Sequence, residues 1–450
     1  MHPNFETHFK QLFGSSYPAF LKAIEEHTEV SMRLNPLKMQ SVDFEDAEKI
    51  PWSLNGYFLK ERPKFYADPL HHAGGYYVQE SSSMFFGQVI PVEKNIVALD
   101  LCASPGGKST LIQSRISENS VLISNELDLK RNKVLAQNLN RWGADNVIVT
   151  NASSKALVST GVLYDFILVD APCSGEGMFR KDKVSLEQWS PNFVSSCAAI
   201  QEEILDDALK MLKPGGVLVY STCTFEPIEN ERQIARVLQS DDFEPISIPN
   251  DGWAEKGALI QDGLTEFPYY YFYLEHSRGE GQFVMAIRKK GDSGEQSFRK
   301  SKKELVKTLQ KKEVQRINEF MDLPTHLSLL EVNGNVHTFP KNKEHLIHKL
   351  MEKIPLWKLG TRVGELSRNH FKPHHDWAMT PWMKNFPTKF ELDYALAIRY
   401  LKKEEVKVDP QWSRGIGIAT YKGIPLGWAK NLGTRLNNSF PKELVIKKTI

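Results

Sequence analysis

Cysteine is scarce in this sequence, with four residues in 450. So few thiols exclude a disulfide framework, and no two of them form the close CxxC pair that zinc sites use. His370, His374, His375 and Asp376 have the side chains of metal ligands, but the adjacent histidines lack the i, i+4 spacing of a helical zinc site. We therefore expect free thiols in a reducing compartment and no bound metal.

The sequence also lacks a long hydrophobic run and a strong excess of charge. No apolar stretch approaches the roughly 18 residues of a membrane span, and the N-terminus has no basic region that leads into an apolar stretch. We expect a soluble, cytoplasmic, monomeric protein without a membrane partner. The net charge of +2 neither requires nor excludes nucleic acid, because local patches matter more than the sum.

Two local patterns bear on nucleic acid. A lysine-rich stretch runs from Lys300 to Arg316, and it could contact phosphates or be a solvated helix face. Basic and aromatic side chains interleave further along, at Trp357, Arg362, Arg368, Phe371, Lys372 and Trp377. That composition is compatible with stacking on RNA and contacting its backbone, and core packing explains the aromatic residues equally well.

Apolar strand-like runs alternate with helical segments from about residue 75 to residue 290. The expected strands are 96–101, 121–126, 147–150, 166–170 and 216–220. Three helices are expected: one that begins at Lys108, one over 128–142 and one over 200–212. This alternation predicts an α/β fold with a doubly wound parallel sheet. The proline and glycines of 213–216 (KPGG) are expected to end the last of these helices.

Composition and pattern divide the chain into five segments. Residues 1–74 read as a small α+β module, 75–290 as the alternating domain, 291–300 as a polar linker, 301–385 as an intermediate domain and 386–450 as a small β-rich domain. The last segment is expected to turn at Gly415, Gly417, Gly423, Gly427 and Gly433.

A glycine-rich turn follows the first strand of the alternating domain. It comprises Cys102, Ala103, Ser104, Pro105, Gly106, Gly107 and Lys108. Glycines let the backbone approach a ligand closely, and the helix N-terminus that follows favours a negative group. Cys102 stands where a P-loop needs its first glycine, which argues against a nucleoside triphosphate. Glu126 ends the next strand, where a carboxylate accepts hydrogen bonds from both ribose hydroxyls of an adenosyl ligand.

Two cysteines follow strand-like runs later in the same domain. Cys173 follows the run that ends at Asp170, and Cys223 follows the run that ends at Tyr220. Residues just beyond the C-terminal ends of parallel strands line the ligand crevice of an open α/β sheet. The two sulfur atoms are therefore expected to face one substrate. Outside such a pattern a free cysteine is usually a small buried hydrophobic residue, as we expect for Cys197.

The glycine-rich turn and both cysteine segments together resemble a known family. Residues 102–108 (CASPGGK), 170–177 (DAPCSGEG) and 221–224 (STCT) resemble successive motifs of the Sun-type (NOL/NOP/Sun) RNA cytosine-C5 methyltransferases, and 75–84 (GYYVQESSSM) looks like their entry motif. The extension that ends in 427–430 (GWAK) is similar to that of the bacterial RsmF branch, whose members methylate small-subunit ribosomal RNA.

The resemblance implies a fold and a cofactor. The fold would be a Rossmann-like methyltransferase sheet with an N-terminal RNA-binding module and a PUA-like C-terminal RNA-binding extension. The cofactor would be S-adenosylmethionine, held by residues 102–108, Glu126 and Arg131, with Asp170 at the border of the cofactor and base sites. The family usually has a further acidic residue near the adenine, where this sequence has 151–154 (NASS).

The resemblance also assigns catalytic roles. Cytosine C5 is too electron-poor to take a methyl group unaided, and addition of a thiolate at C6 makes C5 nucleophilic. That thiolate would be Cys223, with Asp170 hydrogen-bonding the base and Cys173 helping to release the product. An unperturbed thiol has a pKa of about 8.5, so we expect Arg180 or Lys181 to activate Cys223.

The base and its RNA remain to be placed. An aromatic or apolar surface must hold a base that has left its stack, and Phe179 is a candidate. The expected substrate is 16S ribosomal RNA or the small ribosomal subunit. Transfer RNA is an alternative substrate, and a ribosome-assembly factor with incidental methylation is an alternative from another class.

Overall fold

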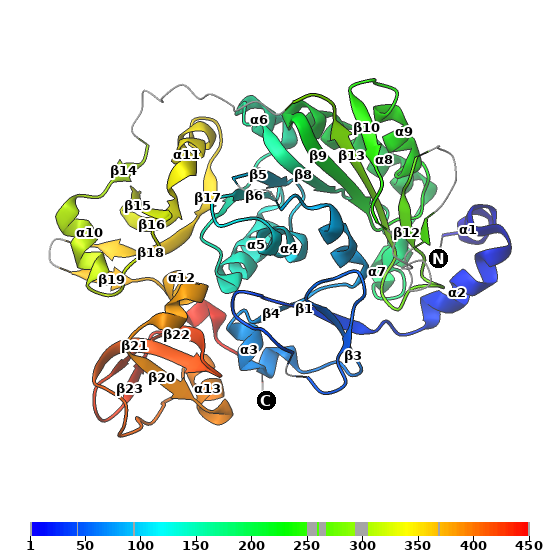
Figure 1. The fold of residues 1–450 in the computed structure, drawn as a ribbon. Coiled ribbons are helices and arrows are strands. Elements are labelled where there is room, and N and C mark those ends of the chain that lie inside the picture. The colour runs from blue at the N-terminus through cyan, green and yellow to red at the C-terminus, as the bar shows by residue number, and fades with distance from the viewer. Residues whose placement is uncertain are drawn as a thin grey trace.

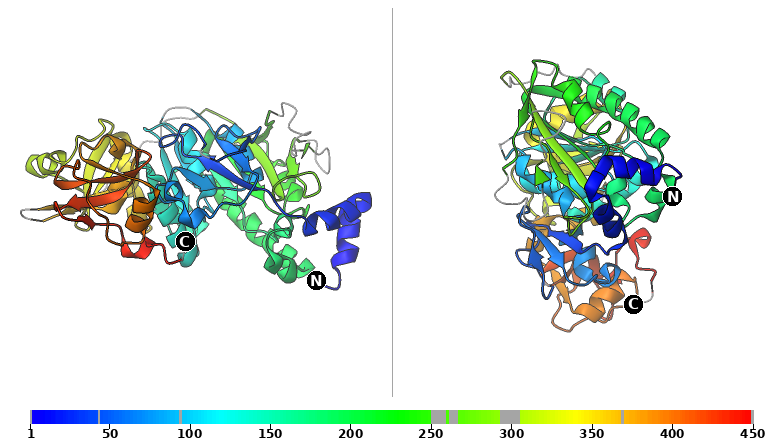
Figure 2. Two further views of the ribbon diagram at one scale, coloured as in Figure 1. Left: turned by 90° about the horizontal axis from the view of Figure 1, so that it is seen from below. Right: turned by 90° about the vertical axis from the view of Figure 1, so that its right-hand side faces the viewer.

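The computed structural model describes residues 2–42, 44–92, 95–249, 259–260, 267–292, 305–367 and 370–448. A large sheet with helices on it forms the centre, with two N-terminal helices at one end and two small C-terminal domains at the other (Figure 1, Figure 2). In the part of the chain that the structure describes, no helix is both long and apolar enough to cross a membrane.

The N-terminal module consists of a helical pair and a small antiparallel sheet. Helices α1 (Phe5–Phe13) and α2 (Tyr17–Glu25) bury their phenylalanines in the core of the central domain rather than on their own sheet. The sheet has the order β2-β3-β1-β4, and its strands are β1 (Val30–Leu34), β2 (Glu48–Lys49), β3 (Gly56–Leu59) and β4 (Tyr76–Val78). The short helix α3 (Pro69–His72) lies between β3 and β4 in the chain. Because β4 pairs with β1, this sheet continues beyond residue 74.

The central sheet has the order β11-β12-β13-β9-β8-β5-β6-β7-β17, and β10 also pairs with β13. Its strands up to residue 289 are β5 (Val97–Asp100), β6 (Val121–Asn125), β7 (Val147–Thr150), β8 (Tyr164–Asp170), β9 (Leu212–Thr222), β10 (Phe243–Ile246), β11 (Leu259–Ile260), β12 (Tyr270–Phe272) and β13 (Gln282–Lys289). Strands β9, β8, β5, β6 and β7 are parallel. The predicted doubly wound sheet is confirmed.

The helices of this domain cover both faces of the parallel strands. They are α4 (Gly107–Arg115), α5 (Leu129–Trp142), α6 (Ser154–Ser159), α7 (Lys183–Gln188), α8 (Pro191–Met211) and α9 (Glu231–Val237). Along β8, Ile167 and Val169 belong to the hydrophobic core on one face, and Phe166 and Leu168 to the core on the other. Burial on both faces explains why these strands read as continuous apolar runs.

The helix expected to end at 213–216 does end there, one residue before the expected limit. Helix α8 ends at Met211, and β9 begins at once with Leu212, so residues 213–216 belong to the strand. Residues 213–216 form a bulge in this strand, because Leu212 lies opposite Tyr164 of β8 and Val217 lies opposite Phe166. Gly215, with a φ of 76°, provides the bend inside the strand.

The first parallel strand, β5, lies between β6 and β8, and this arrangement sets the position of the site. After β5 the next strand, β6, is added on one side of it, whereas β8 and then β9 are added on the other side. In open α/β sheets the ligand crevice lies at such a switch point, beyond the C-terminal ends of the strands. The turns that follow β5, β6, β8 and β9 therefore converge on one edge.

The intermediate domain contributes a strand to the central sheet. Its own sheet has the order β14-β15-β16-β18-β19, whereas β17 leaves it to pair antiparallel with β7. Its elements are β14 (Lys307–Thr308), α10 (Lys311–Asn318), β15 (Leu327–Val332), β16 (Asn335–Pro340), α11 (Glu344–Met351), β17 (Leu356–Leu359), β18 (Thr361–Leu366), β19 (Phe371–Pro373) and α12 (His375–Ala378). The expected linker lies outside the described residues from position 293 onward.

The last domain is a four-stranded sheet with one helix. The order is β20-β21-β22-β23, and the elements are β20 (Lys389–Leu392), α13 (Tyr394–Leu401), β21 (Gly415–Tyr421), β22 (Ile424–Asn431) and β23 (Leu436–Asn438). Only Gly423 and Gly433 of the expected turn glycines lie in turns. Gly415, Gly417 and Gly427 lie inside strands, where a Cβ on Gly427 would stand 2.6 Å from the Tyr400 hydroxyl, so close packing requires glycine there.

Candidate functional site

The two thiols predicted to face one substrate are adjacent in the structure. Cys173 follows β8 and Cys223 follows β9, and these two strands pair in parallel with Asp170 opposite Ser221. The two Sγ atoms lie 3.1 Å apart, and the backbone N–H of Cys223 donates to Cys173 Sγ at 3.3 Å. Both side chains are partly buried, so the pair lies at an accessible end of the sheet.

The surroundings of Cys173 favour the protonated thiol over the thiolate. Its hydrogen bond with Cys223, followed by burial and the charge of Glu229, raises the pKa of Cys173 well above its usual value. A thiol whose pKa is raised keeps its proton and serves as a hydrogen-bond donor. Cys173 is therefore suited to donate to a sulfur anion on Cys223 rather than to act as the nucleophile.

Asp170 and Lys108 connect the cysteine loops with the glycine-rich turn. Lys108 Nζ lies 2.7 Å from Asp170 Oδ2, and the side chains are 13% and 30% exposed respectively. Lys108 belongs to the first turn of α4, after β5, whereas Asp170 ends β8. The pair thus spans the switch point.

The glycine-rich turn is tightly held by its neighbours. Gly106 has a φ of 110°, which favours glycine, and a Cβ on Gly107 would come within 3.3 Å of the Tyr77 ring. The Pro105 carbonyl accepts hydrogen bonds from the Tyr77 hydroxyl at 3.1 Å and from Asn138 Nδ2 at 2.7 Å. The turn is therefore fixed in shape without a ligand.

Arg131 and Ser104 lock the other side of this turn. The Arg131 guanidinium donates to the Ser104 carbonyl at 3.0 Å, and the Ser104 hydroxyl donates to the Arg131 carbonyl at 2.9 Å. Cys102 and Ala103 lie beneath the turn, where Ala103 is buried and burial raises the pKa of the Cys102 thiol. Cys102 is thus a packing residue, and Arg131 braces the turn.

Glu126 has the features of a ribose acceptor. Its Oε1 accepts the backbone N–H of Asp128 at 2.9 Å, while the buried Oε2 has no hydrogen bond and lies 3.5 Å from an Arg131 nitrogen. Buried carboxylate oxygens without a donor are rare, and a ribose hydroxyl would supply one. The residues present therefore fit an adenosyl ligand such as S-adenosylmethionine.

An amide takes the place of the acidic residue that is missing near the adenine. Asn151 Nδ2 donates to the carbonyls of Glu126 and Leu127, at 2.7 and 2.8 Å, and so ties the ends of β6 and β7 together. The backbone N–H of Ala152 donates to Asn125 Oδ1 at 3.1 Å. This segment shapes the wall of the site through its backbone rather than through a charge.

A buried polar cluster, which sequence reasoning missed, joins the two cysteine loops. Ser174 follows Cys173 in the chain and Thr224 follows Cys223; their hydroxyls lie 2.9 Å apart. Both bond the fully buried Glu176, and Ser174 also bonds the fully buried Glu229, which accepts Gln201 Nε2 at 2.6 Å. We call Ser174, Thr224, Glu176 and Glu229 the carboxyl cluster.

Counting hydrogens shows that the carboxyl cluster holds protons. Four contacts join its two hydroxyls and two carboxyls, but the hydroxyls supply only two hydrogens. Protonated carboxyls supply the others, in accord with burial raising the pKa of Glu229 to about 7 and that of Glu176 well above its ordinary range. The signal in the sequence was the run of glutamates at 226, 229 and 231 after Cys223.

The residue predicted to hold the base and one of the two predicted to activate the thiolate have structural roles instead. Phe179 is fully buried and packs against Phe5 and Phe9 of α1, so it offers no surface to a base. Arg180 donates to backbone carbonyls, among them Ala23 O at 2.9 Å, and thereby ties α2 to the central domain. Both were misread because the sequence does not reveal that α1 and α2 pack there.

The histidines near residue 374 form no metal-binding group. His374 Nδ1 lies 3.5 Å from Asp376 Oδ2, but no set of three or more histidine, cysteine or carboxylate ligands converges anywhere in the described residues. Cys197 is buried on α8, as expected of a core residue.

Comparison with known proteins places this site in a family. Residues 88–284 match the family described as 16S rRNA methyltransferase RsmB/F. Residues 1–81 match the N-terminal domain of 16S rRNA methyltransferase RsmF, and 387–446 match the methyltransferase RsmF PUA domain.

Solved structures share the fold of the central part. A methyltransferase homologue from Pyrococcus horikoshii is 27% identical, with a TM-score of 0.56, and the match covers 64% of this chain and 95% of that one. NSun6 from the same organism, solved with SFG, is 19% identical with a TM-score of 0.54 over 65% of this chain and 99% of that one. The second likeness shows the fold alone.

Relatives that match nearly the whole chain are named as methyltransferases of ribosomal RNA. The ribosomal RNA small subunit methyltransferase F of Aliivibrio fischeri (strain MJ11) is 30% identical over 96% of this chain and 94% of its own length. That of Serratia proteamaculans is 30% identical over 95% and 92%, and that of Aeromonas salmonicida is 29% identical over 99% and 98%. The chain belongs to the ribosomal RNA small subunit methyltransferase F family.

Proposed function

We propose that this protein methylates C5 of a cytosine in 16S ribosomal RNA, with S-adenosylmethionine as donor and Cys223 as covalent nucleophile. The observation that carries the proposal is the thiol pair, 3.1 Å apart, beside the Asp170–Lys108 pair at the switch point. The family match and the relatives' names support ribosomal RNA as the substrate.

The order of events follows from the electronics of the pyrimidine. The Cys223 thiolate adds to C6, and the electron pair of the C5–C6 double bond moves so that C5 becomes nucleophilic. Asp170 is positioned to hydrogen-bond the base as charge moves into the ring, and Lys108 holds that carboxylate in place. The bound cofactor supplies an electrophilic methyl group, and C5 takes it up.

Release of the product needs a proton acceptor and the return of the thiolate. After methylation, solvent water takes the proton from C5, the C5–H electron pair restores the C5–C6 double bond, and the electron pair of the C6–S bond leaves with the Cys223 sulfur. Cys173 lies within hydrogen-bond distance of the Cys223 sulfur, so it can stabilise the departing thiolate by donating its own proton. This assigns Cys173 to the release step.

The glycine-rich turn and its braces form the cofactor half of the site in this proposal. Residues 102–108 supply the backbone that approaches the donor, Glu126 accepts the ribose hydroxyls, and Arg131 holds both in place. The N-terminal module of 1–74 and the β-rich domain of 386–450 would select the RNA, and the family matches of residues 1–81 and 387–446 support this.

Nucleoside-resolved methylation tests this function. Bisulfite sequencing of total RNA from cells with and without the protein should show discrete 16S cytosines that lose protection when it is absent. Loss at transfer RNA positions instead would overturn the substrate while keeping the chemistry. Unchanged protection everywhere would contradict C5 methylation and favour the assembly-factor alternative.

A further inference from the structure

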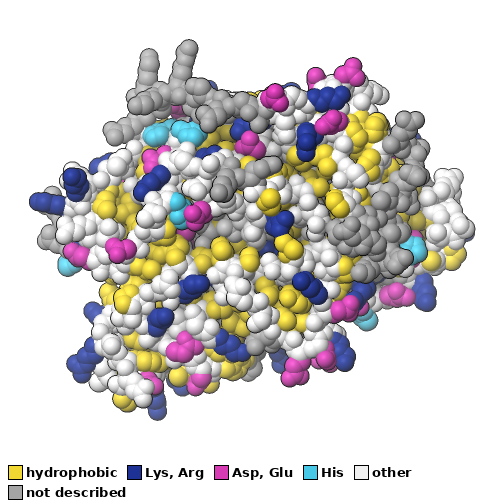
Figure 3. Space-filling view, viewed as in Figure 1, with side chains coloured by type: hydrophobic (Ala, Val, Ile, Leu, Met, Phe, Trp, Pro, Cys, Tyr) yellow, Lys and Arg dark blue, Asp and Glu magenta, His cyan; other side chains and the backbone are white. Residues whose placement is uncertain are grey.

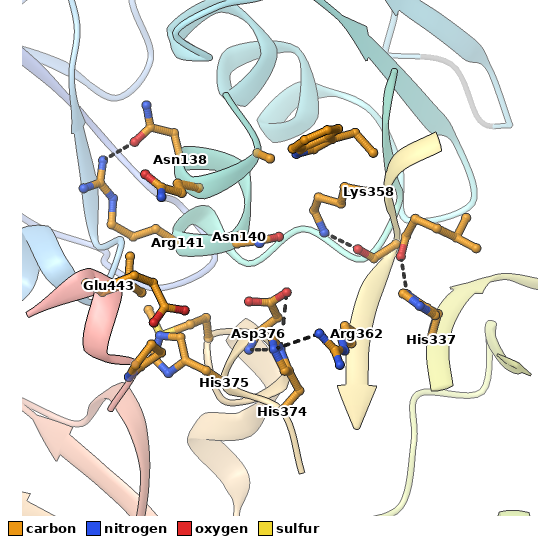
Figure 4. Close-up of a pocket in the computed structure, with 18 of the residues that line it drawn as sticks. Asn138, Asn140, Arg141, His337, Lys358, Arg362, His374, His375, Asp376 and Glu443 are labelled. Atoms are coloured by element: carbon orange, nitrogen blue, oxygen red, sulfur yellow. Dashed lines mark hydrogen bonds and ion pairs between the residues drawn. The ribbon is translucent and has the colours of Figure 1, made fainter. Parts of the chain in front are cut away.

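A cavity of about 550 Å³ lies at the junction of the central domain and the two C-terminal domains. Its walls come from α5, the β17–β18 region, α12 and the segment that follows β23 (Figure 4). None of the residues discussed at the thiol pair lines it. A cavity of this size, formed by four separate elements, is the usual shape of a ligand site.

Two of the three cationic side chains of this cavity have no ion-pair partner among the described residues, whereas the third, Arg362, pairs with Glu365 at 2.6 Å. Arg141, Lys358 and Arg362 line it. Among the described residues no carboxylate pairs with Arg141 or Lys358. The Arg141 guanidinium donates to Asn138 Oδ1 at 2.8 Å, and the Lys358 ammonium donates to the Gly360 carbonyl. Cations that bond only to neutral acceptors favour an anionic ligand.

Two carboxylates, Asp376 and Glu443, also line the cavity, and the charge of Asp376 acts on Lys358. Burial acts to raise the pKa of Asp376, but the contact with His374 at 3.5 Å and the charge of Lys358 hold it below the ordinary value. Figure 4 shows His374 between Asp376 and Arg362, with Glu443 on the opposite side of the cavity. On the face seen in Figure 3, basic and acidic side chains are interspersed.

Trp357 presents an aromatic surface to the same cavity. It is 44% exposed, which is unusual for so large an apolar side chain. The pairing of β17 with β7 shifts register between Leu356 and Lys358, so Trp357 sits at a bulge on the edge of the sheet. Bulges at sheet edges re-aim side chains. A second cavity, of about 410 Å³, is also lined by Trp357, Lys358 and Arg362.

Three buried polar atoms along the cavity have no hydrogen-bond partner. They are Asn140 Oδ1, Arg362 Nε and His375 Nδ1. They offer an acceptor, a donor and a ring nitrogen, which is the mixture that the edge of a nucleobase satisfies. A simple phosphate ion would leave the acceptor unpaired, so the chemistry points to a base together with its phosphate.

We infer that this cavity binds a nucleotide of single-stranded RNA, with the base stacked on Trp357 and the phosphate near Lys358 and Arg141. Stacking on an aromatic ring beside basic groups is how proteins bind unpaired RNA. The inference rests on the proposed RNA substrate, but it assigns a site that is separate from the thiol pair. A free nucleotide has the same chemistry, and the experiment below separates the two sources.

The cavity is connected to the cofactor half of the site through one side chain. Asn138 accepts a hydrogen bond from Arg141 at 2.8 Å and donates to the Pro105 carbonyl of the glycine-rich turn at 2.7 Å. A phosphate that drew Arg141 away would release the Asn138 oxygen. Occupation of the cavity is therefore placed to affect the turn that holds the donor.

Binding of a short fluorescein-labelled single-stranded RNA to the full chain tests the site by anisotropy. Trp357→Ala should weaken binding about tenfold, whereas Trp357→Phe should stay within about threefold of the parent. Lys358→Gln should reduce the slope of log Kd against log salt by about 0.7, the value of one single-strand phosphate contact. Lys353→Gln is the matched control, because Lys353 is exposed nearby and does not line the cavity.

The outcomes separate the cavity from the proposed function. Parent-like affinity and salt slope in both Trp357→Ala and Lys358→Gln, with 16S methylation intact, would overturn the cavity alone. Failure of the parent to bind any RNA would contradict both. Displacement of Trp357-dependent RNA binding by cytidine monophosphate would support the nucleotide chemistry, and binding of the mononucleotide without any effect of Trp357→Ala on RNA would overturn the RNA source.

Discussion

The loops around the thiol pair and the cavity beside Trp357 satisfy their polar groups in different ways. In the carboxyl cluster, every side-chain oxygen of Ser174, Thr224, Glu176 and Glu229 has a partner inside the protein. The four groups are buried, yet they share enough hydrogens to bond one another. The geometry of the loops is thus set before any ligand arrives.

The cavity leaves its polar groups open instead. Asn140, Arg362 and His375 each present a buried atom without a partner, and Trp357 exposes almost half of its surface. Unpaired buried groups cost free energy in the free protein, and a ligand repays that cost on binding. The contrast teaches that the loops of the thiol pair are held by contacts within the protein, whereas the cavity has buried polar groups that lack such contacts.

Removal of the nucleophile should have the largest effect on this comparison. Cys223→Ala should lower the rate of methyl transfer at least about 10³-fold, because C5 is not nucleophilic without an adduct at C6. Cofactor affinity, measured by calorimetry, should stay within about twofold, since the thiol is not part of the glycine-rich turn. A variant that retains a tenth of the parental rate would rule out covalent catalysis by this residue.

A break in the carboxyl cluster should have the next largest effect. Ser174→Ala removes a hydroxyl that bonds both Glu176 and Glu229, so the loop of Cys173 loses its fixed position beside Cys223. We expect kcat to fall about 10²-fold with KM for RNA little changed, the usual cost of a small misplacement. Ser196→Ala on the exposed side of α8 is the matched control. Equal rates in the two variants would contradict a positioning role.

The cofactor half should respond more mildly. Glu126→Gln should raise the Kd for S-adenosylmethionine about tenfold, because a charged acceptor for the ribose hydroxyls becomes neutral. Saturating cofactor should restore most of the rate, which separates binding from chemistry. The same change at Glu118, an exposed residue outside the glycine-rich turn, provides the comparison. Unchanged affinity in Glu126→Gln would show that the ribose is held elsewhere.

The smallest expected effect is on the pH dependence of folding. Burial raises the pKa of Glu229 from 4.5 to about 7, so its contribution to stability is complete below about pH 4.5 and is lost as the pH rises toward 7. Relative to the parent, Glu229→Gln should therefore gain up to about 3 kcal/mol in free energy of unfolding between pH 4.5 and 7.5. Urea unfolding at both pH values measures the difference, and a constant difference would contradict a protonated cluster.

Much of the fold was accessible from the sequence because the parallel strands have a simple signature. Strand β7 has the expected limits, 147–150, and α5 differs from the expected 128–142 by one residue. Strand β17 was not predicted, because an edge strand supplied by a later domain depends on long-range pairing. The stop at 213–216 was also accessible, since α8 ends at Met211 and these four residues then bulge out of the pairing with β8.

The part of the candidate site that sequence motifs mark could be predicted. The juxtaposition of Cys173 and Cys223 follows from parallel neighbouring strands, and the structure places them together. The carboxyl cluster was missed because its members lie up to 55 residues apart and meet only when both cysteine loops are folded. Trp357 and Arg362 were noted for their composition, and only the structure separates them from the buried Trp377.

The most direct test of the central claim is the chemistry of the trapped intermediate. Cys173→Ala, incubated with S-adenosylmethionine and 16S RNA, should accumulate a protein–RNA adduct that survives a denaturing gel. Digestion and mass spectrometry should find a methylated cytidine joined through C6 to the sulfur of Cys223. An adduct through another residue, or rapid turnover with no adduct at all, would contradict the account.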